Sequence, residues 1–300
     1  MANGSITMSD SSYWEWYQRG LEALNATRFS EAEEAFARAR AEALRRGLPL
    51  ADRAYCNWAA VRFWQHRTTG LEKGLSRVLG GSEDPQARRL AAFYMAGLYF
   101  DRKNLKSAKF YGEMAARLAE DLGVIPGQIA SRHFLGLLCL AESRFKEAAA
   151  HLLQALELDT ARELPHTVMT KSSLGYCLAL QGRQGEGLRL LEEALDEMAD
   201  LGCRVYEPIL RLNLGFSLLE GVDLDGAIAQ GEAALKLLET HHEAKFAYYL
   251  LGEGHAQRGA KRQAEEYFEI LQKTYYPQYP GLAQVLLACR TAPMVNWLAK

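Results

Sequence analysis

Apolar side chains recur with a helical period in residues 134–156, FLGLLCLAESRFKEAAAHLLQAL, on both sides of a short polar stretch. Gly136 is followed 12 residues later by Ala148, and then by Leu152 and Ala155. Because residues three and four apart share one face of an α-helix, the stretch predicts two amphipathic helices joined by a polar turn. The small residues Gly136 and Ala148 would let the two backbones approach closely.

The same spacing of 12, 4 and 3 residues occurs seven times along the chain, at steps of 37 to 40 residues. The anchor residues are Gly20, Ala59, Ala96, Gly136, Gly175, Gly215 and Gly252. The second unit is the least regular, because glycines between residues 70 and 81 weaken its second helix. A single helix pair buries too little apolar surface to be stable, so an array of pairs is expected to stack into a continuous core.

This pattern resembles the tetratricopeptide repeat family, in which a Leu-Gly step in one helix precedes an Ala-x3-Phe pattern in the next. The resemblance covers residues 13–276, although these units are longer than the usual length of about 34 residues and mostly lack the closing proline. Their length is similar to that of units in kinesin light chain and in the sensor arms of some bacterial regulators. The resemblance implies an all-α fold, a right-handed superhelical solenoid of seven antiparallel helix pairs.

The two ends of the chain differ from the repeats. Residues 1–12 are small and polar, which predicts a disordered tail, and they lack the basic start and apolar core of a secretory signal. Residues 277–300 predict C-terminal capping helices. The first would have an apolar face made of Leu282, Val285, Leu286 and Cys289, and another would start at Thr291. Such a cap would cover the last apolar face of the array.

Composition narrows the class of function. The net charge of −2 gives no basic field for nucleic acid, and no apolar run of about 18 residues predicts a membrane-spanning helix. The five cysteines are widely spaced with no Cys-x2-Cys pair, which favours a reducing, cytoplasmic setting over a zinc or disulfide site. We therefore expect neither a nucleic-acid nor a membrane partner.

No catalytic motif is present: the sequence has no phosphate-binding glycine loop, no Gly-x-Ser-x-Gly and no His-Glu-x2-His. The run His241-His242-Glu243 does not converge on one ion, because successive helical residues diverge by about 100°. We expect no enzymatic activity, no metal site and no cofactor.

The function implied by the resemblance is that of an interaction scaffold, which binds a peptide segment or helix of another protein in an aromatic-lined concave groove. The alternative is an arm that senses a ligand or signalling peptide in a bacterial regulatory system. Aromatic residues are enriched at the phases that the family turns inward. The predicted contacts are Tyr17, Phe63, Phe93, Phe100, Tyr176, Phe216 and Tyr249, with Phe93, Phe100, Tyr176 and Phe216 at the centre.

Polar residues add to this candidate surface. Asn57 and Asn213 would hydrogen-bond a bound backbone, and the phase of His133 points it inward. Arg132, Lys171 and Arg211 stand four residues before their anchors in consecutive units, as a candidate basic column. Either their stems pack while their heads reach water, or they meet a carboxylate-bearing partner. The expected partner is another protein or peptide, and a homo-oligomer is compatible with the sequence.

Overall fold

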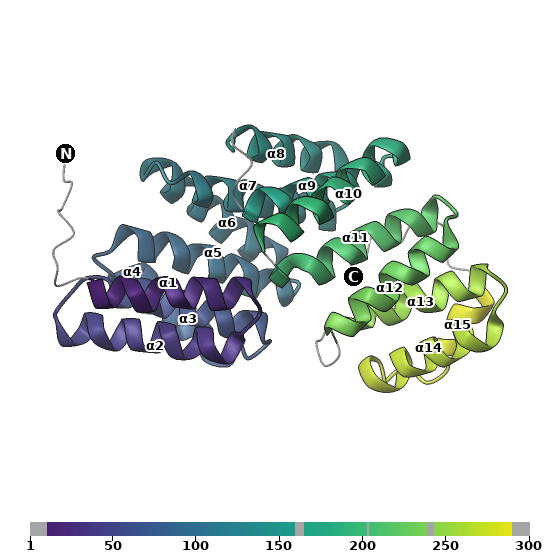
Figure 1. Cartoon of the computed structure of the whole chain (residues 1–300), viewed down its shortest axis with the longest axis horizontal. Helices are drawn as coiled ribbons and strands as arrows, with labels where there is room; N and C mark the ends of the chain where they lie inside the picture. Colours follow the sequence, from purple (N-terminus) through teal and green to yellow (C-terminus); the bar gives the residue numbers. More distant parts are fainter. Residues whose placement is uncertain (1–10, 160–164, 203, 239–242, 290–300) are drawn as a thin grey trace. The chain divides into compact units, whose positions relative to one another are not determined.

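A computed structural model describes residues 11–159, 165–202, 204–238 and 243–289 of the chain (Figure 1). Within these ranges the regular structure is helical, with no strand. The chain separates into two compact units, Met1–Leu138 (unit 1) and Cys139–Lys300 (unit 2). No helix in the described ranges is both long and apolar enough to span a bilayer.

The first helices of successive repeats alternate with second helices along both units. Unit 1 contains α1 (Ser11–Asn25), α2 (Phe29–Arg45), α3 (Ala51–Trp64), α4 (Leu71–Gly81), α5 (Pro85–Asp101), α6 (Leu105–Asp121) and most of α7 (Ile125–Ala141). Unit 2 contains α8 (Phe145–Glu157), α9 (Pro165–Leu180), α10 (Gln184–Leu201), a 3-10 turn (Arg204–Tyr206), α11 (Glu207–Glu220), α12 (Leu224–Leu238), α13 (Ala244–Gln257), α14 (Lys261–Tyr275) and α15 (Leu282–Cys289). The predicted all-α fold is confirmed.

The predicted register is confirmed as well, since every anchor lies on the first helix of its pair and every residue 12 positions later lies on the second. The fifth pair shows why these residues are small. A Cβ added to Gly175 would lie 2.7 Å from the carbonyl oxygen of Gly187, and one added to Gly187 would lie 2.5 Å from that of Gly175. The backbones of α9 and α10 therefore touch, and a side chain at either position would force them apart.

All seven first helices end in the same turn, because the second residue after the helix adopts a left-handed conformation. This residue is glycine only at Gly182 and Gly259, and elsewhere it is Thr27, His66, Lys103, Ser143 or Val222. The next amide donates to the carbonyl five residues back, as from Arg28 to Ala23 at 2.8 Å. This bond satisfies one of the carbonyls that a helix end leaves unpaired.

The ends of the chain partly follow the sequence pattern. Helix α1 begins at Ser11, two residues before the expected start at 13, and the rest of the predicted tail lies outside the described residues. Helix α15 packs on α14: Ala283 is buried, and its N–H donates to Gln272 Oε1 at 3.0 Å. The predicted apolar face is rotated, since Leu286 and Leu287 pack inward whereas Val285 is exposed. The second capping helix, from residue 291, lies outside the described residues, and the proposed domain limits stay a prediction.

Candidate functional site

The predicted aromatic contacts of unit 2 are core residues. Tyr176 is 0% exposed, Phe216 is 2% exposed and Tyr249 is 8% exposed, and all three belong to one hydrophobic cluster. The rings of Phe216 and Tyr249 stack with centroids 6.2 Å apart. The expectation that these rings line an open surface is therefore wrong, because neighbouring first helices α9, α11 and α13 pack directly against one another.

The predicted contacts of unit 1 keep part of their surface open. Tyr17, Phe63, Phe93 and Phe100 are half-buried. Phe93 and Phe100 both meet the buried ring of Phe134 edge to face, at centroid distances of 6.2 Å and 5.8 Å. Such pairs fix the orientation of the two outer rings, and their remaining surface can contact a further apolar group.

The two predicted amides donate hydrogen bonds to the preceding first helix. Asn57 Nδ2 on α3 donates to the Tyr17 hydroxyl on α1 at 2.5 Å, and Asn213 Nδ2 on α11 donates to Ser172 Oγ on α9 at 3.0 Å. Asn57, Asn213 and also His133 are buried. Their predicted contact with a bound backbone is not supported, because burial leaves Asn213 only 2% exposed and its amide already serves the scaffold.

The candidate basic column is a set of intramolecular ion pairs. Arg132 pairs with Glu120 at 2.9 Å, and Arg211 Nη2 pairs with Glu207 at 2.6 Å. The side chain of Lys171, which is 5% exposed, pairs with two glutamates of α10 at 3.2 Å and 2.5 Å. The heads neither stand free for a partner nor, in the case of Lys171, reach water. The column is therefore engaged by carboxylates of the chain itself: within α11 for Arg211, between α7 and α6 for Arg132, and between α9 and α10 for Lys171.

One of these pairs shifts the ionisation of its carboxylate. Burial by itself would raise the pKa of Glu193, but the hydrogen bond and charge of Lys171 outweigh it and hold that pKa below its ordinary value. The ammonium group of Lys171 is thus matched by two glutamates of α10.

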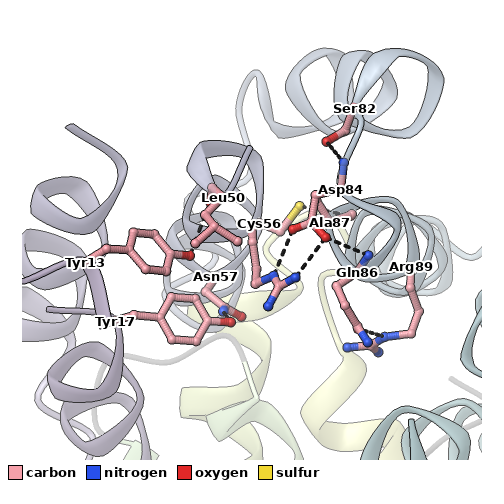
Figure 2. Close-up of polar contacts among 11 residues, drawn as sticks. Tyr13, Tyr17, Leu50, Cys56, Asn57, Ser82, Asp84, Gln86, Ala87 and Arg89 are labelled. Carbon is pink, nitrogen blue, oxygen red and sulfur yellow. Dashed lines mark hydrogen bonds and ion pairs between the residues drawn. The ribbon is translucent and has the colours of Figure 1, made fainter. Parts of the chain in front are cut away.

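A polar cluster in unit 1, which sequence reasoning missed, joins α1, α3 and α5. Arg53 on α3 makes two hydrogen bonds to Asp84, from Nε to Oδ2 and from Nη2 to Oδ1, each 2.8 Å long. Asp84 also caps α5, because its Oδ1 accepts the N–H of Gln86 at 3.0 Å (Figure 2). One carboxylate therefore pairs with the cation of α3 and caps the start of α5.

Arg89 lies one turn beyond this cap on α5 and is only 9% exposed. Its Nε donates to the neutral side chain of Gln86 at 3.0 Å (Figure 2), and no carboxylate among the described residues pairs with it. Burial lowers the pKa of Arg89, and the nearby charge of Arg53 adds to this effect. A Cβ on Gly127 of α7 would lie 2.9 Å from Arg89 Nη1, so the absent side chain there makes room for the guanidinium.

The tyrosines of α1 complete the cluster (Figure 2). The Tyr13 hydroxyl donates to the Leu50 carbonyl at 3.2 Å. The Tyr17 hydroxyl accepts from Asn57, and burial raises the pKa of Tyr17 to about 12, which keeps the phenol protonated at neutral pH. Of this cluster, the sequence pattern marked only Tyr17 and Asn57. The sequence around Arg89 does not reveal that its guanidinium lacks a carboxylate partner. Asp84 is only five residues away in the sequence, but its side chain pairs with Arg53 of α3 instead.

The described residues offer no evident centre for chemistry. They contain no group of three or more His, Cys, Asp or Glu side chains that could hold a metal ion. Cys56, Cys139 and Cys177 are buried thiols, and burial raises the pKa of the Cys56 and Cys177 thiols, which disfavours the nucleophilic thiolate.

Comparison with known proteins bears on the fold. A Rap protein complexed with competence and sporulation factor has a TM-score of 0.68 and 17% identity, and the match covers 93% of this chain and 76% of that one. The Rap conjugation gene regulator of the plasmid pLS20, in complex with the Phr* peptide, has a TM-score of 0.58 and 15% identity. That match covers 96% of this chain and 81% of the other. A tetratricopeptide repeat protein from Parabacteroides merdae has a TM-score of 0.53 and 16% identity. That match covers 94% of this chain and 100% of the other.

No protein-family model and no curated protein matches the sequence. The structural matches agree with the helical repeat architecture found in the described part of this chain. The chain therefore has the fold of the tetratricopeptide repeat proteins.

Proposed function

We propose that the chain is a protein–protein interaction scaffold, and that unit 1 binds a peptide segment of its partner. The observation that carries this proposal is the contrast between the two units. The predicted contact rings are closed into the core of unit 2, whereas Phe93 and Phe100 of unit 1 stay partly exposed on the first helix α5. Fixed aromatic rings with open surface are typical of peptide contacts, because they lose little conformational freedom on binding.

The chemistry around these rings fits a polypeptide better than a purely apolar ligand. The polar cluster of Tyr17, Asn57, Arg53 and Arg89 lies on α1, α3 and α5, and Phe93 and Phe100 also lie on α5. The same helices would thus offer apolar surface for a side chain and hydrogen-bond donors for a backbone or an acid. The proposal assigns binding to the chain, with no catalysis, and it places the chain in the cytoplasm.

The alternative proposal is that the bound segment is a signalling peptide and the chain a sensing arm. Two of the similar structures, both Rap proteins, are complexes with a factor or peptide, which favours this alternative at the level of fold similarity alone. The two proposals differ in the size of the partner: a scaffold holds a segment of a folded protein, whereas a sensor holds a free short peptide.

Site-specific photo-crosslinking in the full chain tests the proposal. A benzophenone amino acid replaces Phe93 or, as the control, Phe110, which is 53% exposed on the second helix α6. In an extract of the source cells, the Phe93 probe should crosslink one polypeptide segment that mass spectrometry can identify, and the Phe110 probe should not. The mass of the captured chain separates a protein from a short peptide.

A synthetic copy of the captured segment should compete for crosslinking, and Phe93→Ala should weaken its binding about tenfold, in line with the loss of one aromatic anchor. Equal crosslinking at both positions, or unchanged affinity in Phe93→Ala, would contradict the assignment of this surface.

A further inference from the structure

Two aromatic rings of α3 face the second helices α2 and α4. Tyr55 and Trp58 are both partly exposed, and their rings stack with centroids 5.7 Å apart. A Cβ added to Gly74 of α4 would overlap the Tyr55 hydroxyl, so the absent side chain makes room for that ring. Helices α3 and α4 also approach each other less closely than the helices of the first, third, fifth, sixth and seventh pairs. The irregular second unit therefore accommodates a pair of stacked rings.

Three arginines from three helices lie over these rings. The guanidinium carbon of Arg40 on α2 is 5.3 Å from the centroid of the Tyr55 ring, and that of Arg77 on α4 is 5.8 Å from it. The guanidinium carbon of Arg62 on α3 is 4.9 Å from the centroid of the Trp58 ring. Cations at such distances are attracted by the negative faces of aromatic rings. The two rings thus gather positive charge where α2, α3 and α4 meet.

Carboxylates of the chain neutralise part of this charge. Arg77 pairs with Asp52 at 2.8 Å. Arg62 shares the carboxylate of Glu33 with Arg67, which follows α3, at distances of 3.4 Å and 2.8 Å. Two carboxylates therefore serve three arginines before Arg40 is counted.

Arg40 adds a cation that no carboxylate of the described residues pairs with. It is exposed, and its guanidinium lies over the Tyr55 ring. Burial raises the pKa of Tyr55, and the charges of Arg77, Arg40 and Arg62 all oppose this rise, so the three cations act on one ring. With Arg40 included, four arginines stand against two carboxylates, which leaves a surplus of two positive charges.

We propose that this cluster is a docking surface for an acidic polypeptide segment. The arginine–aromatic patch consists of Arg40, Tyr55, Trp58, Arg62, Arg67 and Arg77. Acidic side chains of the segment would pair with the surplus charge, and the two rings would contact its apolar parts. The patch lies on α2, α3, α4 and the turn after α3, whereas Phe93 and Phe100 of the proposed peptide contacts lie on α5. The inference therefore adds a second surface and does not rest on the first.

The placement of charge favours a polypeptide over a nucleic acid. Glu33 and Asp52 stand among the arginines of the patch. A nucleic acid carries phosphates at short, regular intervals, so it would bring negative charge close to these two carboxylates. A polypeptide can space its acidic side chains to avoid them, and two acids would match the surplus of two positive charges.

The test measures fluorescence anisotropy of labelled probes with the full chain, at low and at physiological ionic strength. The probes are a peptide of repeated Glu-Gly-Tyr, the same peptide with Gln in place of Glu, and an oligothymidylate of similar length. Arg40→Gln removes the cation that lacks a carboxylate. Arg38→Gln is the matched control, because Arg38 is also exposed on α2 and also lies over an aromatic ring, that of Trp16 at 4.5 Å, outside the patch.

The Glu peptide should bind the wild type and Arg38→Gln with equal affinity, and added salt should weaken both. Arg40→Gln should bind it about threefold more weakly, the loss typical of one exposed ion pair, and Arg40→Glu about tenfold, because the charge is reversed. The wild type should bind the Gln peptide and the oligothymidylate more weakly than the Glu peptide. Phe93→Ala should bind the Glu peptide as the wild type does.

Four results would overturn the inference. Equal losses in Arg38→Gln and Arg40→Gln would show attraction to net charge without a defined surface. Equal binding of the Glu and Gln peptides, or no binding of the Glu peptide, would remove the acidic partner and leave the proposed function standing. Tighter binding of the oligothymidylate would replace the polypeptide with a nucleic acid. A loss in Phe93→Ala with none in Arg40→Gln would place the peptide on the surface proposed above.

Discussion

At the scale of single residues, close backbone contacts make small anchors obligatory. Gly175→Ala should lower the free energy of unfolding by about 1–3 kcal/mol, because the new Cβ would lie 2.7 Å from the Gly187 carbonyl oxygen and 2.9 Å from Leu191 Cγ. Gly185→Ala is the control, since a Cβ there has no neighbour within 4 Å and alanine favours the helix. Urea denaturation measures both; equal effects would contradict the register of the fifth pair.

A buried histidine makes stability depend on pH. His255 stacks on Tyr267 at 5.5 Å, and its buried Nδ1 lacks a partner among the described residues. Burial lowers the pKa of His255, and the charge of Arg258 lowers it further against an opposing effect of Glu232. The unfolded chain protonates this histidine below a pH of about 6.5, whereas the folded chain does so only at lower pH. The free energy of unfolding is therefore highest above that pH and falls as the pH is lowered through it.

His255→Phe should remove this acid sensitivity and keep the stacking on Tyr267. The melting temperature of the variant minus that of the wild type should therefore increase as the pH is lowered from 7.5 to 5.5. A difference between the two proteins that stays constant over this range would show that His255 keeps its ordinary pKa.

At the scale of elements, the turn after each first helix shows how one geometry accepts different residues. Val222 adopts φ = 64° in a position that the fifth and seventh pairs fill with Gly182 and Gly259. A β-branched side chain in the left-handed region is strained, and Val222 is 71% exposed, so it gains little from packing. Val222→Gly should raise the free energy of unfolding by about 1 kcal/mol.

Gly182→Val is the reciprocal change and should lower stability by a similar amount, about 1 kcal/mol. Guanidinium denaturation of both variants checks the pair. If both variants lose stability, the turn would be limited by its side-chain contacts and not by its backbone.

At the scale of the whole molecule, the two units should respond differently to loss of an aromatic ring. Phe216→Ala removes a side chain that is 2% exposed in the core of unit 2, and should lower stability by about 3–5 kcal/mol. Phe93→Ala removes a half-buried ring of unit 1, and its main effect should be on affinity for the captured segment. Calorimetric unfolding together with titration of that segment separates the two effects; weakened binding in a still-folded Phe216→Ala would contradict the division.

The sequence by itself determined the helical class, the seven pairs and their register. These features depend on contacts within a repeat, where the 3.6-residue period dictates which side chains share a face and the small residues at positions such as Gly175 and Gly187 mark where two helices touch. The same reasoning placed Tyr17 and Phe93 on first helices with open surface.

Only the tertiary structure decided which of the side chains predicted to face inward remain exposed and which charged side chains are paired. Tyr176 and Phe93 have equivalent sequence signals, yet Tyr176 is enclosed by the neighbouring first helices and Phe93 is not. Asp84 precedes Arg89 by five residues but turns to Arg53, 31 residues earlier. Exposure and ion pairing depend on side chains that different repeats bring together. The periodic pattern within one repeat therefore does not predict them.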